Sequence, residues 1–151
     1  MDSIAGKYLT FALGSEEYGL PVLKVREIIK VMDITPVPQV PPYVRGVINL
    51  RGKVIPIVDL RLKFALPRRE YSERTCIVVI DVSAVGLLGI VVDAVSEVIN
   101  VAAAEIEEAP ALGASVSTDY LLGLAKVKGT VKILLDLDRV MATDVLAAAA
   151  S

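Results

Sequence analysis

The apolar residues of the chain occur in short blocks, and their pattern predicts β-strands more than helices. KYLTFAL at residues 7–13 alternates as expected of a strand with one buried face, and REIIKV at 26–31 does the same. TCIVVIDV at 75–82 and LLGIVVD at 87–93 are continuous runs rich in β-branched residues, which favours strands buried on both faces. We therefore expect many short strands.

Turn signals divide these strands. GVINL at 46–50 and VIPIVDL at 54–60 flank Arg51-Gly52-Lys53, which is typical of a β-hairpin whose glycine takes a positive φ. Four prolines within residues 36–42 predict an extended loop. One short helix is expected after an N-cap at Asp136 or Asp138, and residues 142–151 are expected to hold its end and a tail.

The chain also resembles itself. At a shift of 77, GVINLRGKVIPIVDL (46–60) aligns with GLAKVKGTVKILLDL (123–137); at a shift of 70, YGLPVLKVREIIKV (18–31) aligns with LGIVVDAVSEVINV (88–101). The matches include glycines and acidic residues, so apolar composition alone does not explain them. The repeat indicates a duplication, with copies at roughly 7–64 and 75–141. Short strands and a twofold repeat together predict two small antiparallel barrels and a mainly β fold.

Composition narrows the chemistry. Hydrophobic residues make up 54% of the 151 residues, enough for a sizeable core, and the longest uncharged apolar stretch, at 82–92, is too short to span a membrane. The sequence contains no histidine and one cysteine, Cys76, which removes the usual general bases and common zinc sites. We therefore expect no catalytic residue, no metal, no cofactor and no disulfide. The amino terminus does not read as a secretory signal, so a cytoplasmic protein is expected.

Charge is distributed unevenly. Residues 1–74 contain 12 Lys and Arg against 8 Asp and Glu, whereas residues 75–151 contain 4 against 10. The basic half leaves open a small β-barrel that binds nucleic acid or a small molecule. It has no run of Arg and Lys interleaved with aromatic residues, however, so nucleic acid is not the expected partner.

Arg51 is the most distinctive charge, because it lies between two apolar strands. At a hairpin tip its guanidinium would reach solvent, where a permanent charge suits a carboxylate on a partner. The alternative is that Arg51 only keeps the hairpin soluble, and the equivalent Lys128 fits either interpretation. Gly46 and Gly52 are assigned to hairpin geometry.

Several of these segments resemble one known family. LTFALGSEEYGLPVLKVREI, PPYVRGVINLRGKVIPIVDLRLKF, LGIVVDAVSEVI and STDYLLGLAKVKGTVKILLDLDRV are closely similar to the CheW family of bacterial chemotaxis coupling proteins, from about Lys7 to Met141. The resemblance implies one CheW-like domain over 1–151, with two five-stranded SH3-like β-barrel subdomains and a short C-terminal helix. Subdomain 1 would span about 14–74, and subdomain 2 about 75–141 plus the strand at 7–13.

The function implied by the resemblance is that of a non-enzymatic adaptor. Such proteins join the cytoplasmic tips of transmembrane chemoreceptors to the regulatory domain of the histidine kinase CheA, without inserting into the membrane themselves. Similar adaptors serve pilus-motility and biofilm pathways, which remain an alternative.

The resemblance also implies which residues bind. The receptor-facing groove would include Val25, Glu27 and Ile29 from the first copy and Val98 from the second, with Arg51 as its charged member. For Val25 and Val98 core packing remains an alternative, because alternation does not say which face of a strand points outward.

Overall fold

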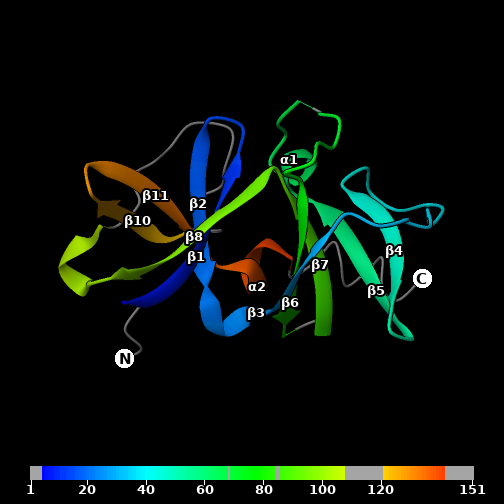
Figure 1. Cartoon of the computed structure of the whole chain (residues 1–151), viewed down its shortest axis with the longest axis horizontal. Helices are drawn as coiled ribbons and strands as arrows, with labels where there is room; N and C mark the ends of the chain where they lie inside the picture. Colours follow the sequence, from blue (N-terminus) through cyan, green and yellow to red (C-terminus); the bar gives the residue numbers. More distant parts are fainter. Residues whose placement is uncertain (1–4, 68, 84–85, 108–120, 142–151) are drawn as a thin grey trace.

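The computed structural model describes residues 5–67, 69–83, 86–107 and 121–141, and in these residues the chain forms two sheets (Figure 1). The five-stranded sheet has the order β3-β6-β7-β5-β4, with β3 Val25–Lys30, β4 Val44–Leu50, β5 Lys53–Asp59, β6 Cys76–Val82 and β7 Gly86–Val92. The six-stranded sheet has the order β8-β1-β2-β11-β10-β9, with β1 Gly6–Leu13, β2 Glu16–Pro21, β8 Ala94–Val101, β9 Ile106–Glu107, β10 Leu121–Val127 and β11 Thr130–Leu135. The predicted mainly β fold is confirmed; the two-residue β9 is one strand more than expected.

The helices are short. They are the 3-10 turns η1 (Val22–Lys24) and η2 (Ala103–Glu105) and the α-helices α1 (Leu60–Lys63) and α2 (Leu137–Val140). The carboxylates of Asp59 and Asp136 cap the two α-helices by accepting backbone N–H groups of Arg61 and Arg139. The predicted helix after Asp136 is thus confirmed, whereas its expected end at 142–151 lies outside the described residues. No described helix is long and apolar enough to cross a membrane.

Each sheet combines strands from both copies of the repeat. The first two strands of copy one, β1 and β2, lie beside β8 and β11 of copy two, while β6 and β7 of copy two lie beside β3 and β5 of copy one. The sheets therefore do not follow the expected division at 14–74 and 75–141. The reason is that the chain crosses between sheets at residues 22–24 and again at Asp93, directly after the second strand of each copy.

The main hydrophobic core lies between the sheets. It joins Leu9 and Phe11 of β1 to residues of β5, β6 and β7, and it includes Leu137 of α2. A smaller cluster lies on the other face of each sheet. The expectation that 7–13 has one exposed face was wrong: Tyr8, Leu9, Thr10 and Phe11 are all buried, because the two faces of β1 contact different clusters.

Candidate functional site

The β4–β5 hairpin presents Arg51 and Gly52 at its tip, as predicted. Their φ values are +52° and +86°, and the backbone N–H of Gly52 donates to Oδ1 of Asn49 at 2.9 Å. Positive φ at both central residues is the geometry that lets a two-residue turn match the twist of its strands. The equivalent tip, Lys128-Gly129, has φ values of +50° and +80°. The repeat therefore preserves this backbone, and a cation precedes the glycine in both copies.

Arg51 forms a two-pronged ion pair with Glu27. Its Nη1 donates to Oε2 of Glu27 at 3.1 Å, and its Nη2 donates to Oε1. Glu27 lies on β3 and Arg51 follows β4, so the pair joins the two edge strands of the five-stranded sheet. A forked contact fixes the guanidinium more firmly than a single hydrogen bond would. The arginine side chain is 69% exposed and the glutamate 29%, so Arg51 stays accessible while it is held.

Apolar and basic residues surround this pair. A cavity of about 570 Å³ is lined by Glu27 and Arg51 together with Arg26, Leu50, Lys53, Ile55, Val79 and Leu87. Beside it, Val54 is 68% exposed on β5. The arrangement offers a surface of four apolar and four charged side chains, in which Glu27 holds the guanidinium of Arg51, and it is suited to binding another protein rather than to bond-making chemistry.

The other predicted binding residues are spread over the molecule. Val25, Glu27 and Ile29 are all half-buried on β3, but a register shift between Val25 and Glu27 places Val25 against the main core and Ile29 against the cluster on the opposite face of the five-stranded sheet. Val98 is 52% exposed on β8, in the six-stranded sheet. The structure therefore brings Glu27 and Arg51 together, whereas Val25, Ile29 and Val98 do not line their cavity.

The glycines assigned to hairpin geometry have different surroundings. Gly46 has a φ of +139° and lies at a register shift in the β4–β5 pairing, close to the loop at Thr35. A Cβ at Gly52 would meet nothing within 4 Å. Both positions need a backbone that favours glycine, but only Gly46 also needs the missing side chain.

Sequence reasoning missed a second apolar surface. Leu23, the middle residue of η1, is 87% exposed and lies beside a cavity of about 400 Å³ that is also lined by Gly6, Tyr8, Pro21 and Leu122. The signal for it is slight: Leu23 occupies the repeat position of Asp93, so only one copy has an apolar residue there. The sequence alone does not predict that an isolated leucine at the end of a strand is exposed.

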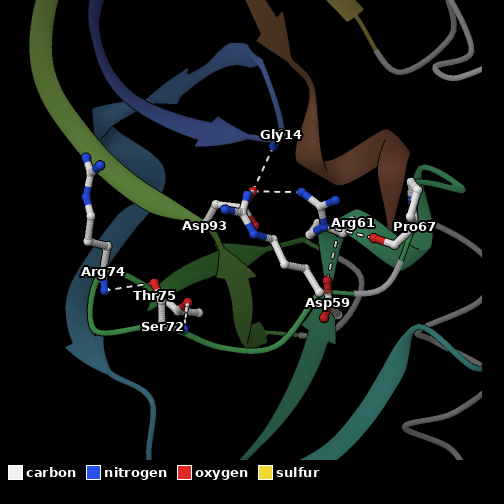
Figure 2. Close-up of polar contacts among 9 residues, drawn as sticks. Gly14, Asp59, Arg61, Pro67, Ser72, Arg74, Thr75 and Asp93 are labelled. Atoms are coloured by element: carbon white, nitrogen blue, oxygen red, sulfur yellow. Dashed lines mark hydrogen bonds and ion pairs between the residues drawn. The ribbon is translucent and has the colours of Figure 1, made fainter.

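A polar cavity of about 240 Å³ lies where the chain passes from β7 to β8 (Figure 2). Arg61 Nη1 and the backbone N–H of Gly14 both donate to Oδ2 of Asp93 at 2.7 Å, and Arg61 Nε donates to the carbonyl of Pro67 at 3.0 Å. Nearby, Tyr71 donates to Asp59 at 3.2 Å; burial, aided by that carboxylate, raises the pKa of Tyr71. A protonated tyrosine cannot act as a general base, and Asp59 and Asp93 accept hydrogen bonds that stabilise the local structure.

Metal binding finds no support in the part of the chain that the structure describes. No three His, Cys, Asp or Glu side chains among those residues lie close enough together to hold an ion. The acidic side chains near the hairpin and the polar cavity are instead engaged with arginines and backbone N–H groups.

The Arg51 hydrogen bond lowers the pKa of Glu27 below the ordinary glutamate value. We expect Arg51→Ala to raise that pKa back toward its usual range, as measured by NMR titration of the Glu27 carboxyl carbon. Because the pKa of Glu27 is lower in the folded state, the ion pair stabilises the fold fully at pH values above the unfolded-state pKa. This stabilisation is lost as the pH falls through the folded-state pKa. Lys128→Ala is the control and should leave Glu27 unchanged; an unaltered titration in Arg51→Ala would show that the pair does not form in solution.

Comparison with known proteins identifies the family to which this sequence is similar. The family model described as "CheW-like domain" matches residues 7–145. The chain is 37% identical over 146 residues to the chemotaxis protein CheW of Klebsiella aerogenes, covering 97% of this chain and 87% of that protein. It is 33% identical over 136 residues to the chemotaxis protein CheW of Rhizobium meliloti, covering 90% and 87%.

A solved structure gives the same result. The crystal structure of the scaffolding protein TtCheW from Thermoanaerobacter tengcongensis superimposes with a TM-score of 0.85 at 33% identity, covering 93% of this chain and 95% of that chain. The likeness extends over both sheets, so it concerns the whole architecture, with its SH3-like subdomains, and not one hairpin. With this family model, these relatives and this fold, the chain belongs to the CheW-like domain family.

Proposed function

We propose that this protein is a non-enzymatic adaptor that couples the cytoplasmic tips of chemoreceptors to the regulatory domain of the histidine kinase CheA. A scaffold role in chemotaxis follows from the family, and the two specific partners are our proposal. In this role the protein is cytoplasmic and reaches the membrane only through the receptors. What supports the proposal most is the Glu27–Arg51 pair, in which an exposed guanidinium is held at a cavity lined by both apolar and charged side chains.

The residues proposed to bind divide by their surroundings. Arg51 supplies the accessible charge, and Glu27 holds its guanidinium in one orientation, so little side-chain entropy remains to be lost on binding. Ile29 lies on the same face of β3 as Glu27, whereas Val25 packs on the main core at the other face, so the two residues anchor that strand from both sides. Val98, on the other sheet, would make a separate apolar contact with the same assembly.

Arg51→Ala is expected to weaken binding to a receptor-tip fragment or to the CheA regulatory domain by about tenfold or more, the scale of a binding hot spot. The fold should be retained, because the arginine is exposed and contributes no core packing. Affinity would be measured by calorimetry with purified partners, and folding by circular dichroism.

Two variants sharpen that experiment. Lys128→Ala removes the equivalent tip cation, for which no ion pair is found among the described residues, and should bind nearly as wild type. Glu27→Ala leaves Arg51 in place but unfixed, and should weaken binding less than Arg51→Ala does. Equal affinities for wild type and Arg51→Ala would remove Arg51 from the binding surface, and a wild-type protein that binds neither cognate partner would refute the proposed function.

A further inference from the structure

The exchange of strands between the two copies raises a question of specificity that does not depend on the proposed function. Because the copies have similar apolar patterns, β1 and β2 could in principle pair with strands of their own copy. The observed sheets instead place β2 beside β11 and β7 beside β5, both in parallel pairs. We call pairing between the two copies the exchanged arrangement and pairing within one copy the unexchanged arrangement. Side-chain contacts that differ between the copies are needed to favour the exchanged one.

The two parallel pairs are equivalent in register, so their contacts can be compared directly. Gly19 of β2 lies opposite Leu134 of β11, and Gly89 of β7 lies opposite Ile57 of β5. These positions differ by 70 and 77 residues, the same shifts that align the repeat. A residue of one pair therefore has a defined counterpart in the other.

The first contact that distinguishes the copies is an ion pair within the β2–β11 pair. Lys132 Nζ donates to Glu17, its register partner, and also lies largely buried, with its side chain 11% exposed. At the equivalent positions of the β7–β5 pair the residues are Leu87 and Ile55, both apolar. In an unexchanged arrangement Lys132 would face Leu87 and Glu17 would face Ile55. Each charge would then lose its partner in a partly buried place, which is strongly unfavourable.

The second contact is the ion pair between Arg61 and Asp93. Arg61 is the second residue of α1 in copy one, and Asp93 follows β7 in copy two. Their side chains are only 12% and 18% exposed, and the N–H of Gly14 in the β1–β2 turn also donates to Asp93. The helix here supplies the cation, and the end of the second strand supplies the anion.

The third contact joins the corresponding elements with the charges reversed, and its side chains are more exposed, at 39% and 35%. Asp138, the second residue of α2 in copy two, accepts from Lys24 Nζ at 3.0 Å, and Lys24 follows β2 in copy one. The N–H of Ser83, in the β6–β7 turn, donates to Asp138 at 2.9 Å. Arg61 and Asp138 are 77 residues apart and so occupy the same repeat position, while Lys24 lies one residue beyond the repeat position of Asp93. Here the helix supplies the anion.

We propose that this reversal of polarity, together with the Glu17–Lys132 pair, specifies the exchange of strands between the two copies. In the exchanged fold each charge of these three contacts meets its opposite. In the unexchanged fold each helix would meet the strand end of its own copy, so Arg61 would face Lys24 and Asp138 would face Asp93. Each pairing of that kind places like charges together where the native fold places an attraction.

The test exchanges charges without changing their number. A helix swap, Arg61→Asp with Asp138→Arg, makes both contacts repulsive in the exchanged fold and attractive in the unexchanged one. A strand-end swap, Lys24→Asp with Asp93→Lys, does the same from the other side. The combined fourfold variant restores attraction in the exchanged fold, although it does not restore the N–H contacts of Gly14 and Ser83.

Disulfide reporters in the full-length chain show which strands are neighbours after refolding from urea. With Cys76 replaced by serine, Val58→Cys with Ile90→Cys can cross-link only when β5 lies beside β7, where these residues are register partners. Val58→Cys with Leu20→Cys reports the unexchanged arrangement, since Leu20 is the repeat counterpart of Ile90. Native Cys76 with Val92→Cys, register partners in the β6–β7 hairpin, is the control that should form in both arrangements.

We expect either swap alone to lose most of the β5–β7 cross-link and to gain the β5–β2 cross-link, and the fourfold variant to recover the native pattern. If a swap alone fails to fold and the fourfold variant folds, complementarity is again shown to be required. An unchanged β5–β7 yield in both swaps would overturn the proposal, as would a fourfold variant that is no better than either swap.

Discussion

Replacing Gly46 by alanine is expected to destabilise the protein severely, by more than about 4 kcal/mol, the range reached when a substitution forces backbone to move. A Cβ at this position would lie 2.0 Å from the carbonyl oxygen of Thr35 and 2.9 Å from the Cα of Pro36, and both are main-chain atoms that cannot rotate away. The φ of +139° adds strain for any residue with a side chain. The loop and β4 would therefore have to separate.

Urea unfolding followed by circular dichroism would measure this loss. Gly52→Ala in the same hairpin is the matched control: its φ is +86°, but open space surrounds the added methyl group. Strain alone should then cost about 1 kcal/mol. Similar losses in the two variants would mean that the close approach of Thr35 to β4 does not exist in solution.

Removing the Arg61 side chain is expected to cost about 3 kcal/mol. Arg61→Ala leaves Asp93 with the N–H of Gly14 and the weaker partner Arg69, and it leaves the carbonyl of Pro67 without its donor. Because Arg61 and Asp93 are both mostly shielded from water, the stranded carboxylate is not well compensated by solvent. The readout is the free energy of unfolding at neutral pH.

Arg69→Ala provides the comparison for that prediction. Arg69 approaches the same carboxylate at 3.5 Å, but its side chain is 63% exposed, so its removal should cost less than about 1 kcal/mol. A second variant, Arg61→Ala with Asp93→Ala, should recover part of the stability by removing the stranded charge. Equal costs for the two arginines would contradict the account of Asp93 as a shielded junction.

The features that the sequence predicted correctly are mostly local ones. The β4–β5 hairpin follows from two apolar runs around Arg51-Gly52, and the cap at Asp136 follows from an acid placed just before the helix. The equivalent helix after Asp59 was not predicted. The twofold repeat could be detected in the sequence because glycines at turns occupy matching positions in the two copies. In each case the physical cause lies within a few residues of the effect.

The features that the sequence could not predict depend on which strands become neighbours. Equivalent strands of the two copies have interchangeable apolar patterns, so alternation is satisfied whether β2 joins β5 or β11. The ion pair between Glu27 and Arg51 could not be predicted either, because it depends on β3 and the strand before Arg51, β4, becoming the two edges of one sheet. The exposure of Leu23 likewise depends on where the crossing segment runs.

The strand exchange also sets the order in which the fold can be completed as the chain leaves the ribosome. The five-stranded sheet has all of its strands once residue 92 has been made, although it begins only at Val25. The hairpin of β1 and β2 emerges earlier, yet its neighbours β8 and β11 are made much later. The β1–β2 hairpin is made before every other strand of the two sheets and is thus among the last to be enclosed, and until then its exposed apolar residues are open to aggregation.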